Sequence, residues 1–305
     1  MEDRAAWVHS EHVRRLATVD PAARLPELDL SAEPHEVLLA EDRESVVVVE
    51  QQHTDPASPP GLWVDEDVHR VQVRCTVAAE PGSLTALLMR AFTGLGEPRP
   101  AHLVTASRDT ALVRPLLTAG FTPATVLALR RLGATAVDEV ASGVHVRPAT
   151  RDDVDALVDA SVAVQAFDST VGVLPERPHA AEVFRPNVES ALREHPGWCW
   201  VAERDGRVVG ACEMEPPEAA GWVTGSVNPP PDGSTTAYLG LLHVEAAERG
   251  TGVGAALVRV AHAHAAEAGA GQVLLHHSAA NPLSMPFWGR AGYRPLMTGW
   301  VRFPA

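Results

Sequence analysis

The sequence predicts an α/β (α+β) fold, with a mixed central sheet flanked by helices, arranged as two tandem domains. Short apolar runs typical of strands alternate with stretches typical of helices. The clearest example is the apolar run from Tyr238 to Val244, which leads into a glycine-rich turn and then into a helix predicted to begin near Val253. The order of elements in the first half parallels the order in the second. With 305 residues, the chain is long enough for two domains of ordinary size.

The first half is predicted to alternate between strands and helices. Its predicted elements are a strand over Ser45–Val49, a turn over Asp55–Gly61, a strand over Val68–Val77, a helix from Pro81, a strand over His102–Ala106, a helix over Asp109–Leu117 and, after Gly120-Phe121, a last strand through Leu129. The segment Ala134–Gly143 breaks this pattern. We therefore predict a first domain over 1–135, a linker over 136–143 and a second domain over 144–305.

Composition and charge exclude several classes of function. The apolar fraction of 46% is typical of a packed globular protein. No apolar run approaches the roughly 18 residues of a membrane span, and the N-terminus lacks a signal-peptide pattern, so we expect a cytoplasmic protein without a membrane partner. The net charge of −14 argues against nucleic acid and suits a cationic or neutral acceptor. Cys75, Cys199 and Cys212 form no metal-binding pattern, which predicts buried thiols. The sequence does not indicate an oligomeric state.

The turn over Arg249–Gly254 is suited to binding an anion. Free backbone N–H groups and the positive end of the following helix face the same point there, and glycines let a phosphate approach the backbone closely. The chain contains no lysine, which excludes a Walker loop. The spacing G-x-G-x-G, with no second strand ending in an acidic residue, excludes a dinucleotide-binding fingerprint. Other residues must identify the phosphate ligand.

The sequence after this turn supplies them. A strand predicted over Gln272–His277 leads to Asn281, then to Trp288, and then to Gly292-Tyr293 before a last strand. The GNAT acyltransferase superfamily has the same order: a strand, an Asn-containing turn, a helix carrying an aromatic residue, and a Gly-Phe or Gly-Tyr pair that opens the last strand. The chain resembles this superfamily in both the order and the spacing of these elements.

The turn itself and the upstream segments extend the resemblance over the second predicted domain. The acyl-CoA loop of the family has the pattern Gln/Arg-x-x-Gly-x-Gly/Ala, and Arg249, Gly252 and Gly254 occupy those positions. The segment Val146–Leu157 resembles the family's first strand and capped first helix, and Trp200–Gly210 resembles the hairpin that follows. The resemblance implies a GNAT-like fold that uses acetyl-CoA as its acyl donor, with no metal.

The first half is interpreted as a degenerate copy of the second. Gly120-Phe121 and Gly292-Tyr293 each follow a short helix and precede a last strand. Where the second half has its glycine-rich turn, the first has Ala78–Ser83, in which Glu80 brings negative charge and Pro81 lacks an N–H. We therefore expect two tandem GNAT-like domains, the first of which binds no acyl-CoA and shapes the acceptor site or acts as a scaffold. The alternative is an unrelated α/β domain with the same order of elements.

The resemblance implies which residues hold acetyl-CoA. The strand before the turn would contact pantetheine through the main chain of Leu242, His243 and Val244. The pyrophosphate would lie on the turn, whose residues are Arg249, Gly250, Thr251, Gly252, Val253 and Gly254. Asn281 would shape its turn or contact the pantetheine arm, with Trp288 in the same site.

The general acid is where the chain departs from the family. The usual residue is a Tyr seven positions after the Asn, and that position is Trp288 here. An indole N–H donates a hydrogen bond but does not usefully lose its proton. Ser284, one turn earlier on the same helix, and Ser278 are possible substitutes. Tyr293 is expected to pack in the core.

Several residues are candidates for the catalytic base. A histidine is suited to remove a proton from an ammonium near pH 7. We place His277 first, because strand alternation puts it in line with apolar residues, followed by His276 and then His243, which should lie on the face opposite Leu242 and Val244. Tyr238, at the start of its strand, is a further catalytic candidate.

Other polar residues are expected to have less direct roles. Glu213 and Glu215 would orient a cationic acceptor, or lie on a solvated strand edge, which we favour. His262 and His264 are expected on the surface. Asp168 lies in the region that covers the acceptor in the family.

These features predict an acyltransferase that moves an acetyl group from acetyl-CoA to a primary amine of a small molecule. The amine would attack directly in a ternary complex, because no Cys lies in the context of a nucleophile. Three alternatives remain open: a catalytically silent CoA-binding or regulatory module, motivated by Trp288, a relative of mycothiol synthase, which also has two tandem GNAT domains, and a protein N-acetyltransferase.

Overall fold

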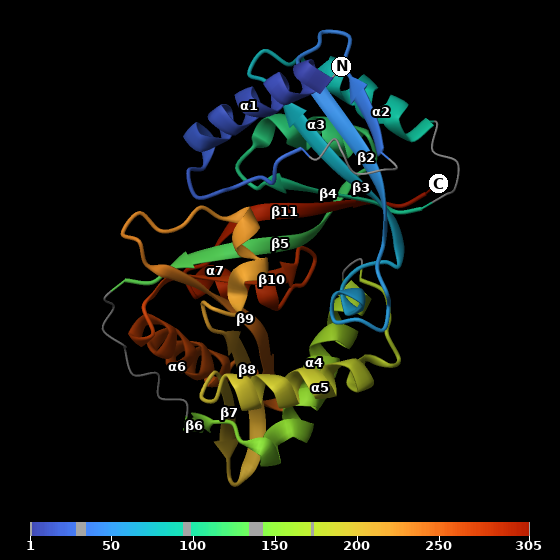
Figure 1. Cartoon of the computed structure of the whole chain (residues 1–305). Helices are drawn as coiled ribbons and strands as arrows, with labels where there is room; N and C mark the ends of the chain where they lie inside the picture. The colour runs from blue at the N-terminus through green and yellow to red at the C-terminus, as the bar shows by residue number, and fades with distance from the viewer. Residues whose placement is uncertain (1, 29–34, 94–98, 134–142, 172–173, 305) are drawn as a thin grey trace.

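One sheet organises the molecule. The computed structural model describes residues 2–28, 35–93, 99–133, 143–171 and 174–304. In these residues, eleven strands form a single mixed sheet with α-helices on both faces, which confirms the predicted fold class (Figure 1). Two neighbouring pairs of strands are parallel and the other pairs are antiparallel.

The first half has the predicted elements and two more. Its helices and strands are α1 (Glu2–Val19), β1 (His35–Leu39), β2 (Ser45–His53), β3 (Asp67–Cys75), α2 (Pro81–Thr93), β4 (Ala101–Ala106), α3 (Thr110–Thr118) and β5 (Thr122–Arg131). The sequence did not predict β1 or α1, whose few buried apolar residues are scattered among charged ones. The linker predicted over 136–143 lies outside the described residues, except for Gly143.

The second half has every element that the resemblance implied. Its helices and strands are β6 (His145–Pro148), α4 (Val154–Val171), α5 (Ala180–Glu194), β7 (Cys199–Arg204), β8 (Arg207–Glu215), β9 (Thr235–Val244), α6 (Val253–Glu267), β10 (Ala270–Ser278), α7 (Ser284–Arg290) and β11 (Arg294–Arg302). The predicted cap of the first helix is present, because Thr150 and Asp153 form a capping box just before α4.

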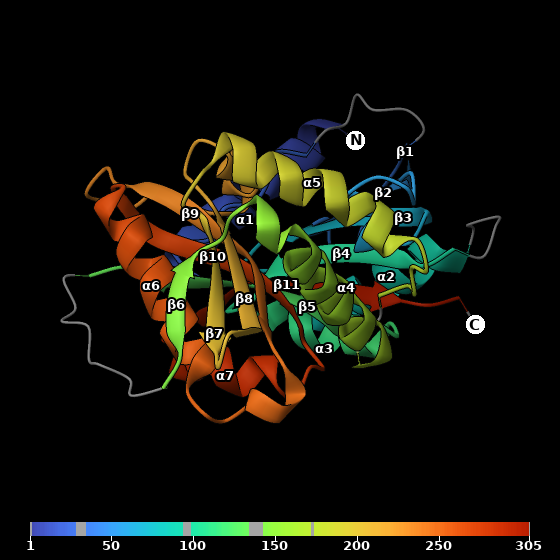
Figure 2. The same ribbon diagram turned by 90° about the horizontal axis from the view of Figure 1, so that it is seen from below.

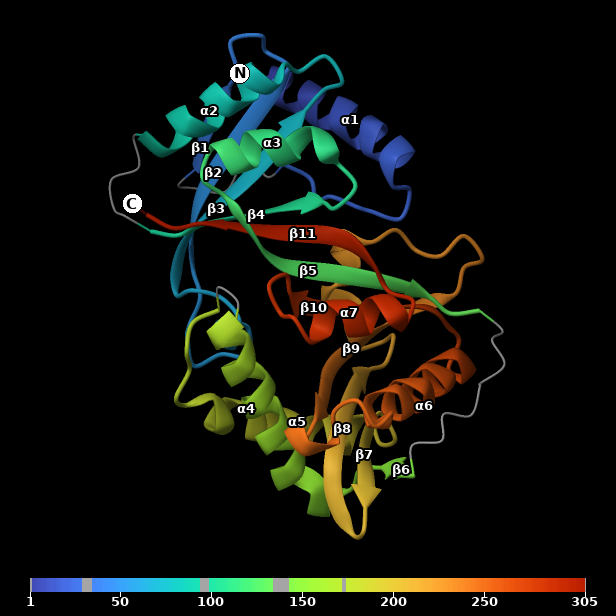
Figure 3. The same cartoon turned by 180° about the vertical axis from the view of Figure 1, so that it is seen from behind.

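The two halves exchange their last strands. The order of strands is β1-β2-β3-β4-β11-β5-β10-β9-β8-β7-β6, so β11 lies between β4 and β5, and β5 lies between β11 and β10 (Figures 1 and 3). Trp300 of β11 is buried in the core of the first half, whereas Val126 and Ala128 of β5 are buried in the core of the second. Each half therefore completes the core of the other.

The turns that open these exchanged strands have the same geometry. Gly120 and Gly292 have φ angles of 85° and 82°. In each turn, the glycine N–H bonds to the carbonyl three residues earlier at 3.1 Å. The N–H of the next residue, Phe121 or Tyr293, bonds to the carbonyl five residues before it at 3.0 Å. The duplication itself stays a prediction, which this likeness supports.

Helices cover both faces of the second half. Helices α6 and α7 pack on one face and α4 and α5 on the other (Figure 2). None of the helices in the described ranges is long and apolar enough to cross a membrane. The edges of strands β9 and β10, between these helical layers, position the candidate site.

Candidate active site

Strands β9 and β10 separate in the middle of the sheet. They pair in parallel from Thr235 and Ala270 as far as Tyr238 and Leu274. Beyond this last pair, β9 continues beside β8, and β10 continues beside β5. We call this separation the β9–β10 splay, formed by residues 239–244 and 275–278. Backbone groups on its two facing edges are not used between the two strands, and buried backbone groups of this kind require partners.

A bulge in β9 sets which side chains face each helical layer. Its register with β8 shifts at Gly240, so that Leu239 and Leu241 lie on opposite faces. After the bulge, Leu242 and Val244 pack toward α6 and α7. Strand alternation places His243 on the opposite face, as the sequence predicts.

The glycine-rich turn has the geometry of an anion site. Gly250 and Gly252 have φ angles of 82° and 94°, which a residue with a Cβ rarely adopts, and Gly252 is the N-cap of α6. In the described residues, no backbone carbonyl accepts a hydrogen bond from the N–H of Gly250, Gly252, Val253 or Gly254. Nε of Arg249 donates to the carbonyl of Val244 at 3.2 Å, which ties the turn to the end of β9. Unused N–H groups at a helix N-terminus favour a phosphate.

Asn281 connects three elements at the end of β10. Its Nδ2 donates to the buried carboxylate of Asp168 on α4 at 2.7 Å. Its Oδ1 accepts from the N–H groups of Leu283 and Ser284, at 2.9 and 3.0 Å, and so caps α7. Burial raises the pKa of Asp168, and it lowers the pKa of the neighbouring His277. Of the predicted residues, Asn281, His277 and Ser284 thus lie at this corner of the splay.

A second polar group lies at the start of the splay. The Tyr238 hydroxyl is hydrogen-bonded to Nδ1 of His276 at 3.0 Å. The indole of Trp222 is stacked on His276, with ring centroids 6.1 Å apart, and its Nε1 donates to Glu215 at 2.7 Å. We call Glu213, Glu215, Trp222, Tyr238 and His276 the Trp222 cluster. It brings together two of the predicted catalytic residues, Tyr238 and His276, and leaves His277 and Ser284 at the other corner.

Burial changes the titration of the Trp222 cluster. Loss of hydration, followed by the charge of Glu215, raises the pKa of Glu213 to about 7. Loss of hydration also raises the pKa of Tyr238, and it lowers that of His276, whose ring lies against Trp222 and Tyr238. Near pH 7, the carboxyl of Glu213 is therefore better suited to exchange a proton than the imidazole of His276.

The expectation that Glu213 and Glu215 lie on a solvated strand edge is wrong. Strand β8 lies between β7 and β9 inside the sheet, and both carboxylates are only partly exposed. The i, i+2 spacing of the two glutamates is a signal that places them on one face of a strand. Trp222 was not singled out, because nothing in its local sequence indicates that a short 3-10 helix, η3 (Ala220–Trp222), packs against Tyr238 in the first half of β9.

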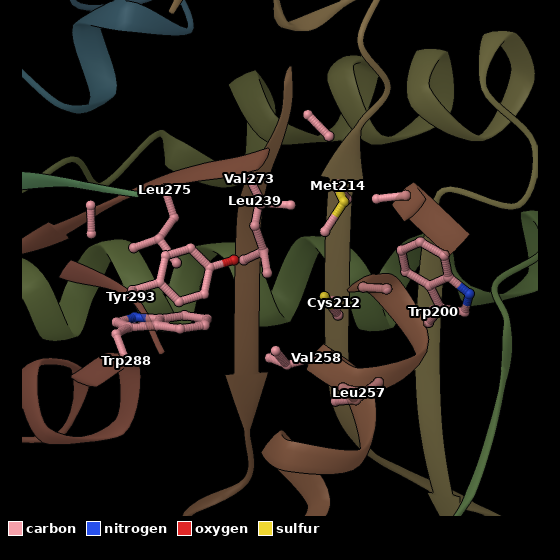
Figure 4. Close-up of a cluster of buried hydrophobic side chains, with 14 of the residues drawn as sticks. Trp200, Cys212, Met214, Leu239, Leu257, Val258, Val273, Leu275, Trp288 and Tyr293 are labelled. Carbon is pink, nitrogen blue, oxygen red and sulfur yellow. The ribbon is translucent and has the colours of Figure 1, made fainter. Parts of the chain in front are cut away.

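The position of the family's general acid is part of the core. Trp288 is 7% exposed and packs against Tyr293 (Figure 4). It also packs against Phe287. Tyr293 packs in the same cluster, as expected, and its hydroxyl is bonded to His262 at 2.7 Å. The expectation that His262 lies on the surface is wrong, since only 6% of this residue is exposed. Helix α6 turns the side chain toward the core. His264 is half-buried beside two tryptophans.

Ser278 has an unusual environment. It ends β10 inside the splay and is 2% exposed. Its hydroxyl has no hydrogen-bond partner in the part of the chain that the structure describes. A buried hydroxyl without a partner carries a cost that a ligand in the splay would relieve.

The corresponding place in the first half is filled by its own side chains. Strands β3 and β4 also pair in parallel only briefly, from His69 to Val71. Nδ1 of His12, on α1, lies 3.1 Å from the backbone N and 3.0 Å from the carbonyl oxygen of Cys75, near the end of β3. Arg15 of α1 is paired with the buried Asp109 at 2.6 Å.

The thiols and the possible metal ligands lie outside the splay. The prediction that Cys75, Cys199 and Cys212 are buried free thiols is confirmed, and burial raises the pKa of each. Within the described ranges, one group of three potential metal ligands, His53, Glu66 and Asp67, is exposed on the first half. Exposed groups of this kind are common without an ion.

Comparisons with known proteins bear on the second half most directly. Residues 166–293 match the family model described as the acetyltransferase (GNAT) family. A search of curated proteins finds no match. Among solved structures, a GCN5-related N-acetyltransferase from Sphaerobacter thermophilus is similar over 98% of this chain and 91% of its own, with a TM-score of 0.59 and 15% identity.

A second solved structure is similar over nearly the whole chain. It is an acetyltransferase of the GNAT family from Colwellia psychrerythraea, which matches over 96% of each chain with a TM-score of 0.50 and 13% identity. At these identities the two structures show likeness of fold. They extend that likeness beyond the residues matched by the family model.

Proposed function

We propose that this chain, whose residues 166–293 match the acetyltransferase (GNAT) family model, transfers an acetyl group from acetyl-CoA to a primary amine of a small molecule. The observation that carries this proposal is the position of the anion-binding turn Arg249–Gly254 directly after β9, where β9 has separated from β10. A phosphate-bearing thioester held at the turn can extend its arm along the free edge of β9. The acyl group then lies between the two polar corners of the splay.

The donor is held mainly by backbone groups in this proposal. The turn binds the pyrophosphate. The main-chain groups of Leu242, His243 and Val244 that face the splay pair with the pantetheine arm, apart from the carbonyl of Val244, which accepts from Arg249. The bond between Asn281 and Asp168 keeps α4 and α7 at the mouth of the splay. Because these contacts are made through the main chain, the side chains at 242–244 remain free to pack.

We assign the base to Glu213 in preference to the histidines. A general base works best when its pKa lies near the working pH, and that of Glu213 is about 7. The amine nitrogen attacks the thioester carbonyl carbon and the C–S bond breaks. The proton released by the nitrogen passes to Glu213, directly or through one water. Tyr238 and His276, held together by their hydrogen bond, orient the acceptor or that water.

Ser278 is the proposed hydrogen-bond donor to the leaving sulfur. Its buried hydroxyl has no partner in the described residues, whereas Trp288 is committed to the core. A thiol of ordinary pKa leaves without a strong acid, so a single hydroxyl is sufficient. Ser284 is a weaker choice, because it lies at the outer corner of the splay, where its backbone N–H donates to Oδ1 of Asn281.

The Trp222 cluster suits a cationic acceptor. Trp222 is 61% exposed yet held by its bond to Glu215, so it offers an aromatic surface beside two carboxylates. Aromatic faces and carboxylates both attract ammonium groups. A basic small molecule, whose ammonium must lose a proton before attack, fits this environment.

We propose that the first half, residues 1–135, is a degenerate GNAT-like domain that serves as a scaffold. Its splay is occupied by His12, and Arg15 lies beside it. The loop between β2 and β3 docks on the second half instead (Figure 1), where Leu62 is fully buried against α5. Arg177, just before α5, donates to two carbonyls of this loop at 2.9 Å.

Binding and turnover measurements test the proposal. Titration calorimetry should detect acetyl-CoA binding to the wild-type protein. Gly252→Asp should abolish it, because a carboxylate then faces the pyrophosphate and the φ of 94° is strained. Gly206→Asp is the matched control, since Gly206 also has a positive φ, of 76°, in the exposed β7–β8 turn. Absence of any CoA-thioester binding by the wild type contradicts the proposal.

Release of free thiol from acetyl-CoA across a panel of basic amines separates catalysis from binding alone. Turnover that is lost in Gly252→Asp and kept in Gly206→Asp supports the acyltransferase. Binding without turnover on any amine favours the second candidate, a catalytically silent CoA-binding module. The observation that favours this module is the burial of Trp288 at the position of the family's acid.

A further inference from the structure

A polar cavity lies at the end of the central strands that is away from the splay. It has a volume of about 490 Å³ and opens where the ends of α1 and β5 meet the start of β11. Arg131 on its wall pairs with Gln272 near the beginning of β10, whereas the splay begins only after Leu274. The cavity is therefore separate from the donor site and independent of the proposed acetyl transfer.

Three arginines and one aspartate give this cavity its charge. Arg108, Arg131 and Arg294 line it, together with Asp20. Asp20 is fully buried and accepts two hydrogen bonds from Arg294, at 2.7 and 2.9 Å. Arg108 lies 3.9 Å from the same carboxylate. One carboxylate thus serves two guanidinium groups.

The third arginine, Arg131, is not in contact with a carboxylate of the described residues. In the described ranges, no carboxylate is paired with Arg131. Partial burial, followed by the charge of Arg294, lowers the pKa of Arg131, and the charges of Asp232 and Asp20, neither of which is ion-paired with it, oppose this in part. The cavity therefore carries excess positive charge in a protein whose net charge is −14. An anion that enters it relieves the repulsion between Arg131 and Arg294.

The remaining walls are apolar. Pro21, Leu129, Pro229 and Pro231 line the cavity beside the arginines. Prolines and a backbone-anchored ion pair make these walls rigid, so little conformational entropy is lost when a ligand binds. A ligand with a small apolar body and a terminal oxyanion matches both surfaces.

We propose that this cavity binds a small organic oxyanion, a carboxylate or phosphate monoester with an apolar body, through Arg131, Arg108 and Arg294. Arg294 is held in place by the bonds from its Nη1 and Nη2 to Asp20, and Arg131 supplies a positive charge that forms no ion pair in the described residues. Planar guanidinium groups bind carboxylate and phosphate oxygens in pairs. None of these residues is part of the acetyl-transfer machinery.

Titration calorimetry of the full chain at low ionic strength tests this site. The probes are phenyl phosphate, benzoate and inorganic phosphate. Phenyl phosphate or benzoate should bind, and phenyl phosphate should bind more tightly than inorganic phosphate because of its apolar body. Arg131→Ala should raise the dissociation constant by about tenfold or more, which is the effect of losing a charge-assisted hydrogen bond. Arg193→Ala, which removes an exposed arginine on α5, should leave it unchanged.

The acyl-CoA turn provides the second comparison. Gly252→Asp should leave phenyl phosphate binding intact, and Arg131→Ala should leave acetyl-CoA binding intact. Arg131 is chosen over Arg294, because removing Arg294 would leave the buried Asp20 with only its longer contact to Arg108 as an ion pair. The proposal is overturned if no organic probe binds the wild type. It is also overturned if binding survives Arg131→Ala, or is lost in Gly252→Asp instead.

Discussion

The Tyr238 hydroxyl lies 3.0 Å from Nδ1 of His276. Tyr238 belongs to the last pair formed by β9 and β10, and His276 lies two residues further along β10. The hydrogen bond joins the two strands at the point where their backbones separate. Both side chains belong to the Trp222 cluster, so the bond also fixes one wall of the proposed acceptor site. Loss of this contact should therefore affect both stability and catalysis.

Tyr238→Phe removes the hydroxyl and leaves the ring in place. We expect the free energy of unfolding to fall by about 1 kcal/mol, the net contribution of a typical hydrogen bond. We also expect kcat to fall roughly tenfold or more, because the acceptor wall is no longer fixed. Tyr293→Phe is the matched control, because it removes the bond to His262 in the core. An equal loss of kcat in both variants would show that the Tyr238 bond has no special role in catalysis.

Glu213→Gln should remove the base without changing the size of the side chain. We expect kcat to fall by roughly a hundredfold to ten-thousandfold. In the wild type, Glu213 must be deprotonated to act, so kcat/KM should rise with pH and level off above about 7. This rise should be absent in Glu213→Gln. A retained rise would assign the titration to another group.

Glu215→Gln should move the pH profile without abolishing it. The charge of Glu215 helps to raise the pKa of Glu213. Its removal should lower that pKa and shift the rise of kcat/KM toward acid. The KM for a cationic amine should increase as well, since Glu215 also holds Trp222. An unchanged profile would mean that the two carboxylates do not interact.

His262 should make the fold sensitive to acid. Burial lowers its pKa to about 3 from 6.5, so the unfolded chain takes up a proton before the folded one does. The stability that depends on neutral His262 is complete above pH 6.5 and is lost as the pH falls toward 3. Its contribution to the slope is about 1.4 kcal/mol per pH unit in that range. Denaturation of His262→Gln at several pH values should give a shallower slope, whereas the exposed His145→Gln should not.

Arg177→Ala should loosen the contact between the first half and the acceptor side of the second. The guanidinium donates to the carbonyls of Gly61 and Val64, both at 2.9 Å. We expect the KM for the amine to rise several-fold, because α4 and α5 lose their support, and the dissociation constant of acetyl-CoA to stay constant. Arg185→Ala, which breaks an exposed pair with Asp155, is the control. A change in acetyl-CoA binding alone would refute the scaffold role.

Local pattern predicted most of the elements, because each depends on nearby residues. The alternation in β3, the capping box before α4 and the glycine turn before α6 all lie within a few positions. The exchange of β5 and β11 was not predictable in this way. The strands that each one pairs with come from the other half of the chain, and pairing partners at such a distance leave no local signature.

The sequence by itself determined the glycine-rich turn over Arg249–Gly254, since its positive φ angles and free backbone N–H groups depend on residues that are neighbours in the chain. Only the tertiary structure decided the pKa values of the titratable groups in the candidate site. Burial raises the pKa of Glu213 and lowers the pKa of His276, which reverses the order of bases expected from their ordinary values. Desolvation depends on what packs around a group, and here strands and a short helix far apart in the chain provide that packing.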